Sequence, residues 1–196
     1  MGTTIVFERG AFRNFRISDS VLKEKRDTPL LSMLVRADTQ TTVFLSHSHD
    51  DLDDFKDILG FLQQCYNVKV YIDSKDPSMP SKTSGETAAR IKRAINTSDK
   101  FIFMATDKAI ASKWCNWELG YGDAQKSIQN VAIFPMKEKG QNDSQYKGYE
   151  YMGLYSSIVY CGSDTVLDDG TKMAPGYYVC SLNDDTLIPL AQWLKQ

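Results

Sequence analysis

One stretch of the sequence combines residue types that can do chemistry at a spacing that brings them together: Ser112–Gly122, which reads SKWCNWELGYG. Trp114 and Glu118 are four residues apart, so on a helix they share one face. Gly122 lies four residues further along that face, and its missing side chain is expected to leave room beside the carboxylate. With Glu118 near the first helical turn, the helix dipole favours an ionised carboxylate. The stretch predicts a pocket wall; the alternative is a core tryptophan beside a structural first-turn charge.

The two histidines of the chain, His47 and His49, stand close together beside Asp50 and Asp51. Their i, i+2 spacing at a strand–helix junction, with no third histidine or cysteine nearby, does not fit a metal site, so we expect none. His49, Asp50 and Asp51 are more simply cap residues of the following helix. No Ser–His–Asp triad can be specified, because the chain lacks a G-x-S-x-G elbow. The absence of a GxGxxG or P-loop sequence disfavours a redox Rossmann enzyme and an NTPase.

Composition narrows the class of protein further. The 196 residues are 42% hydrophobic and 24% charged, as in an ordinary globular domain. Lys and Arg number 23 against 25 Asp and Glu, and a net charge of −2 does not favour nucleic-acid binding. Neither a membrane-spanning apolar run nor a secretory signal is evident, so a cytoplasmic protein is expected. The scattered cysteines are expected to be reduced thiols: Cys65, Cys115, Cys161 and Cys180.

The elements that must position these side chains alternate between strands and helices. Apolar runs rich in β-branched and aromatic residues predict strands over Thr42–Ser46, Val68–Asp73, Lys100–Ala105 and Val131–Met136. Helical spacing of apolar residues predicts helices over about 52–66, 86–97 and 112–126. Ser48 is the expected N-cap of the first helix, with Asp51 completing a capping box. This order predicts an α/β fold with a parallel sheet covered on both faces, and a site beyond the carboxyl ends of its strands.

The two ends of the chain carry weaker signals. Residues 1–40, which include an apolar stretch at Pro29–Val35, are expected to form an N-terminal extension that packs on the core. Residues 162–196 are expected to form a C-terminal extension that also packs on the core. We predict an edge strand near Ile158–Cys161, a hairpin turn at Asp169–Gly170 leading to a strand at Tyr177–Cys180, and a short helix over Leu187–Leu194.

The order of these segments resembles the Toll/interleukin-1 receptor (TIR) domain. FLSHS ends the first strand, YID precedes a long Pro-containing loop, and FIFMAT is followed by SKWCNWELGYGDA and VAIFPM. The resemblance covers residues 41–161 and is closest to the stand-alone bacterial TIR proteins of Thoeris antiphage defence. Its most specific feature is the WxxxE motif, met by Trp114 and Glu118. The resemblance implies a flavodoxin-like three-layer fold and cleavage of NAD+ at the nicotinamide–ribose bond, with Glu118 as the catalytic glutamate.

The same resemblance implies roles for further residues. Ser46, His47 and Ser48 match the family's position bordering the nucleotide, and Trp114 offers a ring for stacking. The Ser74–Gly85 loop matches the family's BB loop, which gates the site and mediates TIR–TIR contacts. Within this loop Lys82 and Thr83 are candidates for phosphate contacts, on composition alone. NAD+ is then the substrate, and no cofactor is expected.

Three functions follow as hypotheses. The first is an NAD+-cleaving TIR enzyme that releases nicotinamide and makes ADP-ribose, a cyclic ADP-ribose-type product or an ADP-ribosyl conjugate. Such a product would serve as an antiphage signal that activates a separate effector, and the protein would self-associate through TIR–TIR contacts. The second is a non-catalytic TIR interaction module. The third is an enzyme of the nucleoside deoxyribosyltransferase type, which also uses a carboxylate at a ribose.

Overall fold

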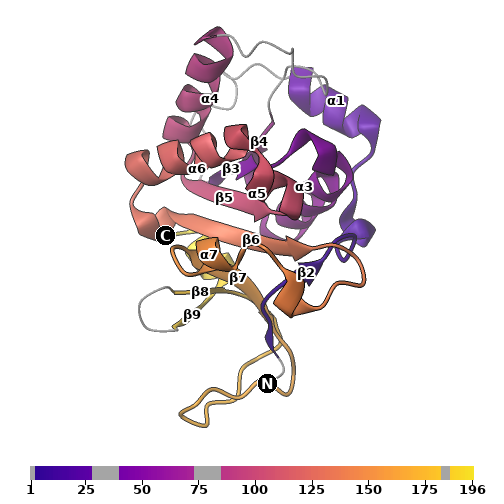
Figure 1. Ribbon diagram of the computed structural model, residues 1–196, viewed down its shortest axis with the longest axis vertical. Helices are drawn as coiled ribbons and strands as arrows, with labels where there is room; N and C mark the ends of the chain where they lie inside the picture. The colour runs from indigo at the N-terminus through magenta and orange to yellow at the C-terminus, as the bar shows by residue number, and fades with distance from the viewer. Residues whose placement is uncertain (1–2, 28–39, 73–84, 182–185) are drawn as a thin grey trace.

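A parallel sheet forms the centre of the computed structural model, which describes residues 3–27, 40–72, 85–181 and 186–196. Its strands run in the order β4-β3-β5-β6-β7 (Figure 1). They are β3 (Thr42–Ser46), β4 (Lys69–Tyr71), β5 (Lys100–Ala105), β6 (Val131–Lys137) and β7 (Ser156–Cys161). The predicted parallel sheet is therefore confirmed. The winding reverses at β3, and in open α/β sheets the crevice at such a switch point is where ligands bind.

The strands are apolar on both faces, and each face packs on a different set of helices. On β5, Ile102 and Met104 belong to the same core cluster as the buried side of α3. Phe101 and Phe103 point the other way, into the cluster that contains residues of α4 and α6. The helices are α3 (Leu52–Tyr66), α4 (Gly85–Thr97), α5 (Asp107–Ala111) and α6 (Lys113–Gln125). Two helical layers around one sheet make the flavodoxin-like fold that the sequence predicts.

The N-terminal segment is built into the sheet and into one helical layer. Strand β1 (Thr3–Thr4) pairs antiparallel with β7, and β2 (Phe7–Glu8) pairs parallel with β6. Beyond β2, Phe12 is buried in the α3 side of the core. A short 3-10 helix, η1 (Arg13–Phe15), and α1 (Asp19–Asp27) follow. The stretch at 29–35 lies outside the described residues.

This segment covers the face of α3 that would otherwise meet solvent. A Cβ atom at Gly60 would lie 1.8 Å from the carbonyl oxygen of Phe15, so only glycine lets the two backbones approach this closely. Under that cover, the charged residues Asp54, Lys56 and Asp57 of α3 are buried. Phe55 is buried, as expected for the apolar face of this helix. Polar residues outside that face, such as Asp54 and Asp57, are buried as well.

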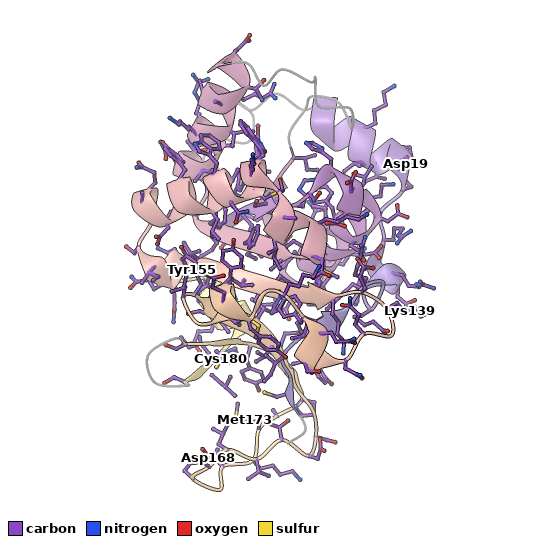
Figure 2. All side chains as sticks on the ribbon, in the orientation of Figure 1. Asp19, Lys139, Tyr155, Asp168, Met173 and Cys180 are labelled. Carbon is purple, nitrogen blue, oxygen red and sulfur yellow. The ribbon has the colours of Figure 1, made fainter. Side chains whose placement is uncertain are left out.

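The C-terminal part extends the sheet with antiparallel strands. Strand β7 pairs with β6 on one side and with β8 (Gly176–Cys180) on the other, so the expected edge strand is an internal one. The predicted hairpin is confirmed, with Gly170 at a positive φ of 87° in its turn. It projects from the body, and Asp168 lies near its tip (Figure 2). The expected terminal helix is instead a strand, β9 (Leu187–Pro189), followed by a short helix, α8 (Leu190–Trp193).

Short elements complete the chain: η2 (His49–Asp51), η3 (Ile128–Asn130), η4 (Asp143–Gln145) and α7 (Tyr149–Met152). Within the described ranges, no helix combines the length and the apolar character needed to cross a bilayer. Helix α5 has no counterpart among the elements predicted from the sequence. It begins at the N-cap Thr106, whose hydroxyl accepts a hydrogen bond from the Ala109 amide.

Candidate active site

Glu118 lies in the second turn of α6, which begins at Lys113. The helix is capped by Ser112, whose hydroxyl accepts a hydrogen bond from the amide of Cys115 at 3.2 Å. The sequence places Glu118 near the first turn, and in the structure it lies in the turn that follows. Because the effect of the helix dipole falls off within the first turn, it does not account for a carboxylate at this position.

A hydroxyl from the neighbouring strand holds the carboxylate instead. Ser46, the last residue of β3, donates a hydrogen bond from Oγ to Glu118 Oε2 at 2.5 Å. Both side chains are nearly inaccessible, with exposed fractions of 1% for Ser46 and 6% for Glu118. Hydrogen bonds to a carboxylate are charge-assisted and stronger than neutral ones. The strand end and the helix, which are far apart in sequence, are thus joined at this carboxylate.

Glu118 opens onto a cleft at the carboxyl end of β3. The cleft encloses about 390 Å³ of space not filled by atoms, including the part open to solvent. The side chains that line it are mostly aromatic or aliphatic: Phe44, Leu45, His47, His49, Tyr71, Ile91, Trp114 and Glu118. Of these described lining residues, Glu118 is the one carboxylate.

Trp114 forms part of the same wall, as the i, i+4 spacing predicts. One neighbour of its ring is Trp117, which stacks on it with centroids 4.7 Å apart and planes inclined by 26°. The indole Nε1 of Trp114 is buried and has no hydrogen-bond partner among the residues that the structure describes. The wall therefore presents an aromatic ring beside the carboxylate.

His47 follows Ser46 directly and also lines the cleft. Its Nδ1 lies 3.1 Å from the carbonyl oxygen of Leu45, and since a carbonyl only accepts, Nδ1 is the donor. The ring stacks on Phe55 of α3, with centroids 3.8 Å apart and planes inclined by 17°. The thiol of Cys115 donates a hydrogen bond to the backbone carbonyl of His47 at 3.3 Å.

Cys115 is buried beneath this wall with an exposed fraction of 2%. Burial raises the pKa of its thiol to about 12, and the charge of Glu118 adds to that rise. Cys115 is therefore a protonated hydrogen-bond donor at neutral pH.

Ser48 does not line the cleft. Its hydroxyl accepts a hydrogen bond from the amide of Asp50 at 3.3 Å and caps η2, so its observed contact is with the chain's own backbone. The predicted capping box is wrong, because the carboxylate of Asp51 turns away from Ser48 and accepts a hydrogen bond from the hydroxyl of Thr106. Lys82, Thr83 and the rest of the loop up to residue 84 lie outside the described residues.

The role expected for Gly122 is also wrong. A Cβ atom at this position would lie 2.8 Å from Cδ2 of Phe101. The missing side chain therefore makes room for a core phenylalanine of β5, and not for a ligand beside Glu118.

Sequence reasoning missed several lining residues. The sequence pattern predicts only a helix-cap role for His49 and no site role for Tyr71 or Ile91, yet all three line the cleft. Tyr71 stacks on Phe44 at 5.7 Å with an interplanar angle of 15°, which extends the aromatic wall across β4 and β3. The sequence does carry a signal for Tyr71, because it lies near the carboxyl end of a predicted strand that neighbours β3. The carboxyl ends of adjacent parallel strands meet at one edge of the sheet. No group of three or more His, Cys, Asp or Glu side chains in the described part of the chain is arranged to hold a metal ion.

Two comparisons with known proteins bear on this site. The sequence profile of the TIR domain family matches residues 43–161, which include all the lining residues described above. A bacterial protein from Bacillus cereus (strain MSX-D12), named "Probable 3′ cyclic ADP-D-ribose synthase ThsB′", is 34% identical over 118 residues. The matched stretch spans 59% of this chain and 59% of the length of that relative. With a profile match over more than half of its length and a TIR-like strand order, the chain belongs to the TIR domain family.

Proposed function

We propose that this TIR domain is an enzyme that cleaves NAD+ at the nicotinamide–ribose bond, with Glu118 as its catalytic residue. The observation that carries the proposal is the placement of this buried carboxylate in the wall of an aromatic cleft, where Ser46 holds one of its oxygens. The name of the Bacillus cereus relative, a probable cyclic ADP-ribose synthase, supports the same class of reaction.

The chemistry of the bond fits a site with one carboxylate. Nicotinamide leaves NAD+ as a neutral molecule, so its departure requires no proton from the protein. Positive charge develops on the ribose as an oxocarbenium ion, and a fixed carboxylate stabilises this charge more in the transition state than in the substrate. The low exposure of Glu118 strengthens that electrostatic effect, because water screens it less than at the surface.

The rings around the carboxylate are suited to a dinucleotide. Trp114 and Tyr71 offer aromatic surfaces for the planar nicotinamide or adenine groups. His47, which follows β3 directly, adds a polar ring to the wall, and the stack on Phe55 fixes the orientation of that ring.

For the product, we infer a cyclic ADP-ribose in preference to ADP-ribose or a conjugate, because the relative is named for a cyclic product. Such a molecule would act as an antiphage signal on a separate effector. Self-association through TIR–TIR contacts is part of the same proposal, and it sets the conditions of the assay.

The test is an assay of nicotinamide release from NAD+ by the purified protein, at several concentrations and with a crowding agent, followed by chromatography of both products. Glu118→Gln keeps the shape of the side chain and removes its charge, and we expect a loss of at least about 10²-fold. Glu150→Gln, which makes the same change at an exposed position of α7, is the matched control and should retain wild-type activity.

Other outcomes select other functions. Self-association without NAD+ turnover under any assembly condition would favour a TIR interaction module. Turnover of deoxynucleosides with NAD+ untouched would favour the nucleoside deoxyribosyltransferase type.

A further inference from the structure

Both histidines of the chain, His47 and His49, lie in the wall of the cleft that contains Glu118. Their ring centroids are 6.2 Å apart. Imidazole is the side chain best suited to accept or give a proton near neutral pH. Since nicotinamide leaves as a neutral molecule, bond cleavage does not explain a histidine at this site.

The step after cleavage does require a base. The C1″–N bond breaks and its electron pair leaves with nicotinamide, which makes the ribose an oxocarbenium ion. Attack by a hydroxyl of the same molecule closes a cyclic product, and attack by water gives ADP-ribose. In both cases a C1″–O bond forms and the attacking O–H must lose a proton. A positioned base speeds such a transfer by about 10²–10⁴-fold.

His47 is held as such a base. Because Nδ1 donates to the carbonyl of Leu45, the neutral ring carries its basic lone pair on Nε2. Phe55 fixes the plane of the ring, and the thiol of Cys115 fixes the backbone carbonyl of the same residue. A catalytic group is most effective when packing and hydrogen bonds hold its geometry in advance.

His49 is held less firmly. It lies in η2, its side chain is exposed, and it is not part of the strand end that carries Ser46. Of the two imidazoles, His47 is also next in sequence to the serine that holds Glu118.

We propose that His47 is the general base of the second step, which accepts on Nε2 the proton of the attacking hydroxyl or water and then returns it to solvent. This assignment rests on the proposed function, and it adds a division of labour. Glu118 stabilises the cation that forms when nicotinamide leaves, and His47 activates the oxygen that captures it.

The experiment compares two fates of the same intermediate. Capture by isotopically labelled nicotinamide regenerates NAD+ and needs no base, because the pyridine nitrogen has no proton to lose. Capture by an O–H group gives cyclic product or ADP-ribose and needs one. His47→Asn retains an amide donor for the Leu45 carbonyl but cannot accept the proton. We expect the ratio of O–H products to exchanged NAD+ to fall about 100-fold or more, while exchange remains measurable.

Two further variants separate this role from a structural one. His47→Gln places its amide nearer to the position of Nε2 than to that of Nδ1, and it also cannot accept the proton. It should therefore lower the ratio as well. His49→Gln should keep the ratio of the wild type, whatever its effect on the overall rate. Thermal unfolding of each variant shows whether the fold is intact.

Two results would overturn the assignment. The first is a ratio that is unchanged in both His47 variants, including the case in which exchange and O–H products are lost equally. The second is a ratio that falls in His49→Gln but not in the His47 variants. If the wild-type protein releases no nicotinamide at all, the proposed function fails instead, and the two failures are therefore distinguishable.

Discussion

Replacement of Arg9 by methionine tests how the N-terminal segment is tied to the site. Arg9 follows β2, and its guanidinium contacts carboxylates from three other parts of the chain. Nε donates to Asp54 at 2.7 Å and Nη1 donates to Glu138 at 2.5 Å. Nη2 lies 2.9 Å from Oδ1 of Asp51, an ion-pair distance without hydrogen-bond alignment. Methionine keeps much of the stem of the side chain and removes the charge.

The expected cost follows from the burial of these partners. The side chains of Asp51 and Asp54 are 0% and 6% exposed, whereas Glu138 is 43% exposed and contributes little. Removing one partner of a buried ion pair typically costs about 3–5 kcal/mol, because a buried charge is left uncompensated. For a chain of this length, each kcal/mol shifts Tm by about 2–4 °C, so Arg9→Met should lower Tm by about 6–20 °C at neutral pH.

The loss of stability in Arg9→Met should depend on pH, and the pKa of Asp51 sets the direction of that dependence. Burial raises the pKa of Asp51 above its ordinary value of 3.8, against the lowering effects of the Thr106 hydrogen bond and the Arg9 charge. Between the ordinary and the raised pKa the unfolded state binds fewer protons than the folded state, so stability falls as pH rises. Without Arg9 the folded pKa rises further. The deficit of Arg9→Met should therefore be largest at neutral pH and shrink as the pH falls toward about 4.

Thermal and urea unfolding of the two proteins from pH 4 to 8 checks the prediction. Arg13→Met, an arginine-to-methionine change at an exposed position of the same segment, is the control and should shift Tm little. A deficit for Arg9→Met of less than about 1 kcal/mol at neutral pH, or one that grows on acidification, would refute the reasoning.

Two further predictions concern α6. Gly122→Ala should lower the free energy of unfolding measured by denaturant titration, because overlap with Phe101 costs about 1–3 kcal/mol. The control is Gly120→Ala, whose added carbon would have nothing within 4 Å. It should be neutral or stabilising in the same titration. Equal effects of the two changes would contradict the close packing of Phe101. Iodoacetamide at pH 8 should modify the exposed Cys65 in the native protein and reach Cys115, with its pKa raised to about 12 by burial, only after unfolding. Mass spectrometry of the labelled peptides tests this, and early labelling of Cys115 would contradict its buried position.

The strands and the WxxxE pair are predictable from sequence because their signals are local. Thr42–Ser46 and Lys100–Ala105 are predicted with their observed bounds, since runs of apolar residues of that length fit buried parallel strands. Trp114 and Glu118 share a wall because the helical period places i and i+4 on one face.

Other features depend on contacts that no local pattern encodes. The hydrogen bond from Ser46 to Glu118 joins residues 72 positions apart. Asp51 fits a capping box by spacing, yet its carboxylate pairs with Thr106 and Arg9, from segments before and after it. Gly122 reads as space for a ligand until Phe101 is placed beside it.

The long-range contacts of Asp51 lie in η2, between the end of β3 and the start of α3. His49 at its beginning lines the cleft, and Asp51 at its end is fixed by Thr106 and by the charge of Arg9. A buried carboxylate that loses its cation must move or take up a proton, and either change would act on a turn only two residues from His49. We therefore expect the position of His49 in the cleft wall to depend on Arg9, which precedes the residues matched to the TIR family. Deletion of the N-terminal segment should accordingly impair the site as well as the fold, although the described part of that segment contributes no lining residue.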